Sequence, residues 1–339
     1  MRVAVYDPYF DTLGGGERYS AAFTRVFIQH GDKVDIWWPE NMAAQVKQRF
    51  GIDISAANFV NRRPSADYDI LFWVSDGSLP TSWAKKTIIH FQFPFTAVGG
   101  KSWSNRIKSH FYTFIANSQF TKQFVDSEFG INSQVIYPPV GVDEIKPGKK
   151  ENIILYVGRF SNLTQAKGHQ VLIDVFKGIS KQIPHWRMIL VGGSGVGTDE
   201  VGMRQLISSI GHYPIDIVTN PTWAQLKKLY AKSKVYFSAS GYGVNSSAEP
   251  LRVEHFGITV VEAMAAGCVP VVVDAGGHRE IVTARFGYLW QRLDQARQLL
   301  VEICKDDANW QLFSARARKL SQKFSYNVFK EAMLQICEK

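Results

Sequence analysis

Cysteine is scarce in this chain of 339 residues, and its three cysteines form no pattern. Cys268, Cys304 and Cys337 are odd in number and far apart, which excludes a disulfide framework and the ligand spacing of a metal site. Long hydrophobic runs are also missing. The apolar start is too short for a signal peptide, and no later stretch approaches a membrane-spanning helix. We therefore expect a cytoplasmic protein, either soluble or lying on a membrane surface.

Acidic residues are absent from one long region. From Gly77 to Val125 there is no Asp or Glu, while aromatic side chains alternate with bases. The bases are Lys85, Lys86, Lys101, Arg106, Lys108 and Lys122. This composition is typical of an interfacial membrane surface or a site for a lipid phosphate, and equally of a solvated basic face over core aromatics. The formal charge of +9 does not separate nucleic acid, anionic lipid and nucleotide sugar as partners.

The length and the 45% hydrophobic content predict two domains with a sizeable core. Buried strands alternate with helical patterns in both halves, which predicts an α/β fold with two doubly wound parallel sheets. A Pro- and Gly-bearing stretch at 137–150 interrupts both patterns. We therefore predict an N-terminal domain at 1–149, a second domain at 150–321 and a closing helix at about 322–339.

The predicted strands of the first half are 2–7, 33–38, 68–74, 87–91 and 114–116, and its helices are 17–29, 41–50 and 118–128. In the second half a strand from residue 152 and a helix at 168–181 are followed by strands at 186–191, 215–218, 234–238, 269–273 and 287–290.

Two glutamates surround a glycine that opens a predicted helix in Glu254-His-Phe-Gly-Ile-Thr-Val-Val-Glu262. The free N–H groups around Gly257 and Ile258 and the positive end of the helix dipole favour an anion. Glu254 can accept hydrogen bonds from hydroxyl groups beside that anion. The segment therefore suits a bound phosphate-sugar, although two glutamates alone also fit an ordinary surface helix.

The string from Glu254 to Pro270 resembles the E-x7-E signature of retaining GT-B glycosyltransferases of family 4. Further motifs follow the family's order along nearly the full chain. They are Gly14-Gly15-Gly16, Asn117-Ser118, Val157-Gly158-Arg159-Phe160 with Lys167-Gly168, Gly192-Gly193-Ser194-Gly195, Val218-Thr219-Asn220-Pro221 and Gly276-Gly277-His278. The resemblance implies two Rossmann-like domains that face each other across a cleft. It places the acceptor on the N-terminal side and the nucleotide-sugar donor on the C-terminal side, and its closing helix packs back on the first domain.

The resemblance also implies roles for individual residues. Arg159 and Lys167 would neutralise a diphosphate, Glu254 would hold sugar hydroxyls, and Glu262 would hold the ribose. His90, at the carboxyl end of a strand, would contact the sugar from the other domain. The remaining residues expected at the donor are Gly15, Gly16, Gly158, Gly193, Val218, Asn220, His255, Phe256, Gly257 and Ile258.

Simpler interpretations stay open for several of these features. His90 could be a satisfied core histidine, Gly14 to Gly16 could form a loop without a ligand, and Ser118 could only cap a helix. Asp67-Tyr-Asp69 has the D-x-D form of metal-dependent transferases, but it precedes a strand and the pattern is common by chance. The polar insertion at 241–252 departs from the family and leaves the lid of the cleft in doubt.

The function expected from this resemblance is transfer of a hexose from GDP-mannose or a UDP-sugar to a hydroxyl of a glycan or lipid-linked acceptor. We expect no cofactor, no metal and no nucleic acid partner, and a location that is cytoplasmic or peripheral on the inner face of a membrane. An anionic membrane surface is a further candidate partner. Two alternatives are a catalytically silent nucleotide-sugar-binding scaffold and a basic nucleic-acid-binding protein, which predicts steeply salt-dependent binding.

Overall fold

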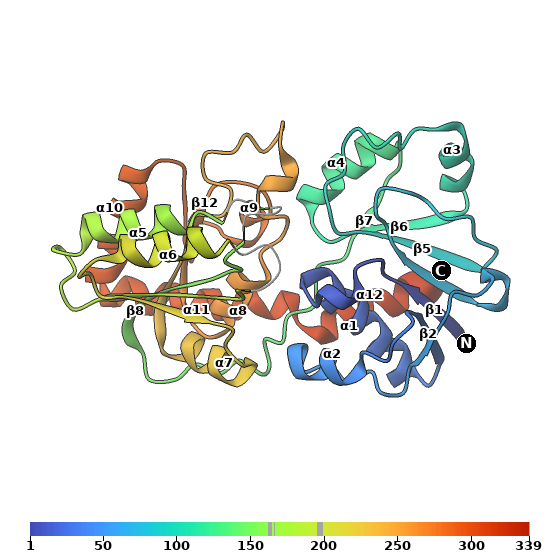
Figure 1. Cartoon of the computed structure of the whole chain (residues 1–339), viewed down its shortest axis with the longest axis horizontal. Coiled ribbons are helices and arrows are strands. Elements are labelled where there is room, and N and C mark those ends of the chain that lie inside the picture. Colours follow the sequence, from blue (N-terminus) through green and yellow to red (C-terminus); the bar gives the residue numbers. More distant parts are fainter. Residues whose placement is uncertain (162–164, 166, 195–198, 339) are drawn as a thin grey trace. The chain divides into compact units, whose positions relative to one another are not determined.

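The structure is a computed structural model that describes all residues except 162–164, 166, 195–198 and 339 (Figure 1). Gly195 of the predicted glycine turn lies outside the described residues. The chain divides into two compact units, the first formed by Met1–Pro139 with Tyr326–Lys339 and the second by Val140–Ser325. The boundary precedes the predicted 149/150 because Val140 already forms a bridge with Ser325 of the second unit.

The first unit contains a seven-stranded parallel sheet of order β3-β2-β1-β4-β5-β6-β7. Its strands are β1 Arg2–Tyr6, β2 Lys33–Trp37, β3 Asn58–Val60, β4 Ile70–Val74, β5 Lys86–Phe91, β6 Tyr112–Ala116 and β7 Gln134–Val135. Its helices are α1 Gly15–His30, α2 Ala43–Phe50, α3 Trp103–Ser109, α4 Gln119–Phe129 and α12 Tyr326–Glu338, with 3-10 turns at Phe10–Thr12 and Ser65–Asp67. The strand order reverses between β1 and β4, as in a doubly wound fold.

Two apolar clusters fill the two faces of this sheet. One lies under α1, α2 and α12 and includes Phe23, Phe72 and Ile88, and the other lies under α4 and includes Phe91 and Phe129. Helix α12 is far from α1 in sequence, but the two run side by side in Figure 1, and Phe329 meets Tyr19 edge-on with ring centroids 4.9 Å apart.

The second unit contains a six-stranded parallel sheet of order β10-β9-β8-β11-β12-β13. Its strands are β8 Glu151–Val157, β9 Arg187–Gly192, β10 Ile215–Thr219, β11 Ser233–Ser238, β12 Val269–Val273 and β13 Tyr288–Trp290. Its helices are α5 His169–Ile179, α6 Glu200–Ile210, α7 Trp223–Lys232, α8 Ile258–Ala265, α9 His278–Ile281, α10 Leu293–Lys305 and α11 Asp307–Ser321, with 3-10 turns at Pro250–Arg252 and Gln322–Phe324. The expected α/β class with two doubly wound parallel sheets is therefore confirmed.

Lys150 forms hydrogen bonds to the ends of two helices of the second unit. Its half-buried ammonium donates to the carbonyl oxygens of Tyr230 at 3.3 Å and Ser233 at 2.7 Å, near the end of α7, and of Ala266 at 2.7 Å, just after α8. Burial lowers the pKa of Lys150 below its ordinary value. These bonds satisfy carbonyls that a helix end leaves without partners, and they fix α8, whose other end carries the Glu254 to Gly257 loop.

Across the described parts of the chain, no helix combines the length and the apolar character needed to cross a bilayer.

Candidate functional site

Three loops meet at the carboxyl edge of the second sheet, after β8, β9 and β10. The Phe160 N–H donates to the Gly193 carbonyl at 3.0 Å, and the Asn220 N–H donates to the Gly192 carbonyl at 2.8 Å. The Ser194 N–H donates to Asn220 Oδ1 at 3.0 Å, and Asn220 Nδ2 donates to Ser194 Oγ at 2.9 Å. In this way the predicted residues Gly193 and Asn220 become parts of one hydrogen-bonded rim. Val218 lies two residues earlier, half-buried in β10.

The glycines of this rim are needed for close approach. A Cβ added to Gly192 would lie 2.0 Å from the Gly158 carbonyl oxygen, and one added to Gly158 would lie 2.4 Å from the Tyr156 hydroxyl. No side chain fits either position without displacing backbone or a buried ring. The next residue is Arg159, whose side chain is exposed at the end of β8.

Lys167 and Glu254 form an ion pair at the same edge. Lys167 Nζ lies 3.0 Å from Glu254 Oε2, and the two side chains are only 13% and 17% exposed. Lys167 also donates to Gln165. Burial alone would raise the pKa of Glu254, but the positive charge of Lys167 and its hydrogen bond lower this pKa to about 2. Glu254 is therefore a largely desolvated carboxylate held in its charged form by one ammonium.

Two glycines that follow β12, Gly276 and Gly277, pack against the backbone of the Glu254 loop. The Gly277 N–H donates to the Glu254 carbonyl at 2.7 Å. A Cβ on Gly276 would lie 2.2 Å from that carbonyl oxygen, and a Cβ on Gly277 would lie 2.4 Å from the His255 oxygen. Gly257, at the start of α8, has a φ of +115° that only glycine adopts readily. The backbone from Glu254 to Gly257 is thus held by glycines on both sides.

His255 and Phe256 are buried within the second unit. The Phe256 ring meets Phe324 edge-on at 5.3 Å, and His255 Nε2 lies 3.3 Å from the Leu251 oxygen. Burial lowers the pKa of His255 to about 4. Both side chains shape the loop, whereas Ile258 is the half-buried first residue of α8.

Glu262 is buried in α8, where the Tyr230 hydroxyl of α7 donates to its Oε2 at 2.9 Å. Glu262 is therefore not a solvated side chain on an ordinary surface helix. Burial and the nearby Glu262 raise the pKa of Tyr230 well above its ordinary value. The contact of Glu262 with a ribose stays a prediction.

The remaining predicted site residues belong to the first unit. Gly15 and Gly16 form the first turn of α1, which begins two residues before the predicted Glu17, because the Gly14 N–H donates to Glu17 Oε2 at 2.5 Å and caps the helix. A Cβ on Gly16 would lie 1.4 Å from Gln92 Oε1, so the Gln92 side chain rests directly on this turn.

His90 is fully buried beneath α1 and stacks on Tyr19 with ring centroids 3.9 Å apart. Burial lowers its pKa to about 3, so the imidazole is neutral. Neither ring nitrogen has a hydrogen-bond partner among the described residues. The predicted contact of His90 with a sugar requires a movement of the groups that cover it and stays a prediction.

Two groups of this structure were not expected. His278, in the Gly276-Gly277-His278 motif, is buried after β12 with Nδ1 3.0 Å from the Val273 oxygen, and burial lowers its pKa below the ordinary value. In the first unit, Asp7 is buried at the end of β1. Burial and the nearby Glu17 raise the pKa of Asp7 to about 7. The sequence did contain one indication of Asp7, because this acidic residue directly follows an apolar strand.

No three His, Cys, Asp or Glu side chains gather into a metal-binding group within the described ranges. Asp69 of the D-x-D string lies at the amino end of β4, where it accepts from the Arg2 N–H at 2.8 Å and pairs with Lys85 at 2.7 Å. The insertion at 241–252 forms turns, in which Arg252 pairs with Glu249 at 2.6 Å.

Comparison with known proteins agrees with this geometry. The family of glycosyl transferases group 1 matches residues 142–320, more than half of the chain, and the chain belongs to this family.

Among curated relatives, the GDP-Man:Man(3)GlcNAc(2)-PP-Dol alpha-1,2-mannosyltransferase of Dictyostelium discoideum is 25% identical over 232 residues, covering 61% of this chain and 42% of that protein. Spore coat protein SA of Bacillus subtilis (strain 168) is 26% identical over 201 residues, covering 57% of this chain and 49% of that protein. The chain thus spans less than half the length of these relatives.

Among solved structures, a glycosyltransferase from Rickettsia africae ESF-5 has a TM-score of 0.78 at 17% identity, covering 99% of this chain and 97% of that chain. Anabaena Alr3699/HepE in complex with UDP and glucose has a TM-score of 0.73 at 16% identity and covers 100% of both chains. At this identity the likeness concerns the fold, which is the GT-B fold with two Rossmann-like domains.

Proposed function

We propose that this protein is a retaining hexosyltransferase that moves a sugar from a nucleoside diphosphate to a hydroxyl of a glycan or lipid-linked acceptor. The observation that carries the proposal is the contact of Lys167 with Glu254 at the carboxyl end of the second sheet. Ligands of doubly wound sheets bind at this edge. Its surroundings resemble the E-x7-E signature of family 4, with Glu262 eight residues after Glu254 in the next helix.

Each charged group of the site has a task in this reaction. The exposed Arg159 guanidinium and the Lys167 ammonium neutralise the diphosphate and stabilise the charge that develops as it leaves. The amides of Gly257 and Ile258, at the positive end of α8, add hydrogen bonds to the same phosphates. Because no enzymic nucleophile is evident among the described residues at this edge, catalysis rests on positioning and on stabilisation of the leaving group.

The ion pair itself becomes part of donor binding. Without a donor, Lys167 and Glu254 neutralise each other at 3.0 Å. A donor presents phosphate oxygens to Lys167 and sugar hydroxyls to Glu254, so each side chain exchanges one partner for another that suits its charge. A nucleoside diphosphate without the sugar takes Lys167 and leaves Glu254 unpaired, and it therefore binds less tightly than the complete donor.

The names of the relatives guide the choice of donors and acceptors. Curated relatives use GDP-mannose and a dolichol-linked glycan, and a solved neighbour was crystallised with UDP and glucose. Both GDP-mannose and UDP-sugars therefore belong in the donor panel, and a polyprenol-linked glycan belongs among the acceptors. We place the enzyme at the inner face of a membrane, with no metal requirement.

The test is thermal stabilisation by a panel of UDP-, GDP- and ADP-sugars, followed by turnover with the donor that binds. A ligand that binds only the folded state raises its stability in a concentration-dependent way. We expect one donor to stabilise the wild type and Arg159→Ala and Lys167→Ala to abolish that shift. Lys305→Ala, at an exposed lysine at the end of α10, should leave it unchanged.

Three outcomes separate the alternatives. Transfer, or slow hydrolysis of the bound donor, supports the enzyme. Binding without either reaction makes the protein a silent scaffold. A Lys167→Ala variant with full turnover removes the role of the ion pair.

A further inference from the structure

The first unit exposes an unusual group of large apolar side chains. Trp83, Trp103 and Phe111 are 76%, 79% and 77% exposed, and Ile107 is 45% exposed. We call these four residues the α3 patch. Single exposed apolar residues are ordinary, but a cluster with two nearly free tryptophans marks a surface that binds something.

Helix α3 places its apolar side chains on one side. Trp103 and Ile107 are four residues apart and so lie on the same face of the helix, and Phe111 follows two residues after the helix ends. No residue of α3 is fully buried. Helix α3 lies beside β6 in the first unit (Figure 1). The exposure of Trp103 and Ile107 leaves the face that carries them largely open to solvent.

Hydrogen bonds bring the segment that carries Trp83 to the same place. Lys108 of α3 donates to the Leu79 carbonyl at 2.9 Å. The Tyr112 hydroxyl donates to the Pro80 carbonyl at 3.0 Å and accepts from the Ser82 N–H at 3.1 Å. Trp83, the next residue, thus lies beside the end of α3 that leads to Phe111.

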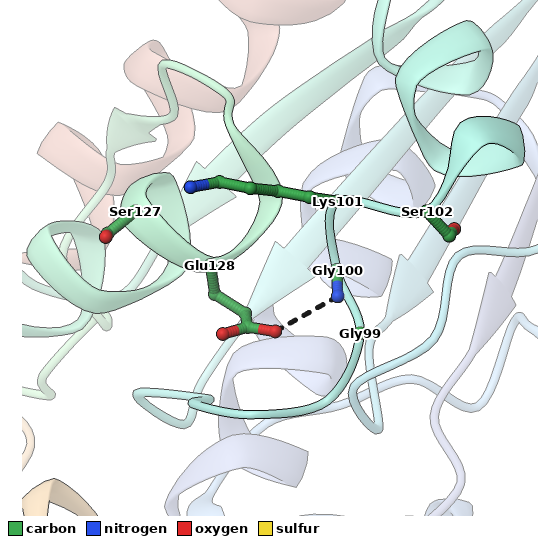
Figure 2. A pocket seen from close by; sticks show the side chains of 6 residues that line it. All are labelled: Gly99, Gly100, Lys101, Ser102, Ser127 and Glu128. Atoms are coloured by element: carbon green, nitrogen blue, oxygen red, sulfur yellow. Dashed lines mark hydrogen bonds between the residues drawn. The ribbon is translucent and has the colours of Figure 1, made fainter.

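A carboxylate anchors the loop that leads into α3. Glu128 of α4 accepts from the N–H groups of Ala97 at 2.9 Å, Val98 at 3.0 Å and Gly100 at 3.0 Å. These backbone bonds hold the pKa of Glu128 below its ordinary value. Figure 2 shows the Glu128 carboxylate reaching the Gly100 N–H, while the Lys101 side chain runs across α4 toward Ser127. A Cβ added to Gly130, at the end of α4, would lie 3.8 Å from Lys101 Cε, so the Lys101 side chain lies on the α4 side of this loop.

Every charged side chain of the segment that carries the patch is basic, since no acidic residue occurs from Gly77 to Val125. Arg106 is exposed within α3, between Trp103 and Ile107 in sequence, and the exposed Lys101 precedes the helix by two residues. Lys85 pairs with Asp69.

We propose that the α3 patch docks on an anionic lipid bilayer. Trp and Phe side chains bind at the boundary between headgroups and acyl chains, where an aliphatic residue such as Ile107 also finds an apolar environment. The positive charges of Arg106 and Lys101 then attract the negative headgroups. A nucleic acid would give Ile107 no stacking partner, and two exposed bases would neutralise few phosphates.

This inference goes beyond the proposed function and rests on it only for the lipid-linked nature of the acceptor. The protein would meet such an acceptor at the membrane in which its lipid is embedded. The docking itself needs neither donor nor acceptor, so it can be measured separately from transfer.

The experiment is co-sedimentation of the full chain with vesicles of phosphatidylcholine alone and of equal parts phosphatidylcholine and phosphatidylglycerol. We expect wild type to bind the mixed vesicles more tightly. Lys101→Gln with Arg106→Gln should lower binding to mixed vesicles about thirty-fold, because each base near an anionic surface contributes about 1 kcal/mol. Trp83→Ser with Trp103→Ser should lower binding to both vesicles by roughly tenfold or more.

Matched controls come from the second unit. Leu312→Ser, at a side chain 46% exposed, and Lys305→Gln should bind vesicles like wild type. Because all substituted side chains are exposed, circular dichroism and the donor-induced thermal shift should be unchanged.

Several results would overturn the inference. The inference is wrong if the wild type does not bind mixed vesicles, or if the patch variants bind them as tightly as the wild type. It is also wrong if vesicle binding is lost only on changing Arg316, Lys319 and Lys323, which line a basic hollow of the second unit. Patch variants that lose binding to an oligonucleotide, while vesicles are not bound, would assign the surface to nucleic acid. Vesicle binding through the patch without any transfer activity leaves this inference intact and removes only the proposed function.

Discussion

Replacing Lys167 with Met removes the ammonium that lies 3.0 Å from the Glu254 carboxylate and keeps an unbranched side chain of similar length. Glu254, which is 17% exposed, would then be a largely desolvated charge without its main partner. Burial would raise its pKa above the ordinary value, whereas the pair lowers it to about 2 in the wild type. The variant should therefore be less stable, and by an amount that depends on pH.

The magnitude follows from the pKa of Glu254. A fall from 4.5 to about 2 corresponds to about 3 kcal/mol of folding free energy. Because the folded-state pKa is depressed, this contribution is present above about pH 4.5 and is lost as the pH falls toward 2. Near neutral pH, the free energy of unfolding of Lys167→Met should be at least about 3 kcal/mol below that of the wild type, because the pKa of Glu254 would rise above 4.5 without the ammonium.

The assay is urea-induced unfolding of both proteins, followed by circular dichroism at neutral pH and at several acidic values. Because the chain has two compact units, it can unfold in two transitions. The transition to be measured is the one whose midpoint changes in Lys167→Met. The difference between wild type and variant should shrink as Glu254 becomes protonated. Lys167→Met with Glu254→Gln should be more stable than Lys167→Met alone, and the exposed control Lys305→Met should change stability by less than about 0.5 kcal/mol.

A stability difference that stays constant across the acidic range would refute this reasoning, because it would show that Lys167 acts through packing and not through the charge of Glu254. A double variant no more stable than Lys167→Met would lead to the same conclusion.

Three further predictions concern groups around both sheets. Asp7→Asn should stabilise the first unit by an amount that grows as the pH rises from about 4 to about 7 and then levels off, because the unfolded chain ionises this carboxyl in that range while the folded state keeps it protonated. A pH series of melting temperatures checks this, and a difference that is constant from about pH 4 to about pH 7 would contradict it. Gly276→Ala should weaken donor-induced stabilisation, since its Cβ would lie 2.2 Å from the Glu254 carbonyl oxygen, and unchanged donor affinity would show that the loop moves freely. Tyr230→Phe should cost about 1–3 kcal/mol in urea unfolding because the buried Glu262 loses a donor, and a neutral effect would mean that another group replaces it.

The central strands could be predicted because each is a continuous buried apolar run. β4, with the sequence Ile-Leu-Phe-Trp-Val, is buried at every position. β3 and β7 were missed because they are edge strands of three and two residues that are partly exposed. α3 was missed for a related reason, since none of its seven residues faces a core that would impose a helical period on the sequence.

The site could be predicted as a set of residues but not as a set of contacts. The motifs indicated Lys167 and Glu254 separately, and their ion pair depends on β8 and β11 being neighbours in the sheet. Strand order is a property of the whole fold, so local spacing contains no sign of it. The bond between Glu262 and Tyr230 likewise depends on how α7 packs against α8.

The placement of α12 has a consequence for the order in which the protein is made. Phe329, Met333 and Ile336 complete the core of the first unit, although the rest of that unit ends at Pro139. The second unit is one uninterrupted stretch, Val140–Ser325, and its whole sequence is synthesised before α12. During translation the first unit therefore receives the helix that completes its core only after the sequence of the second unit has been made, and until then the apolar residues that α12 covers stay without this partner.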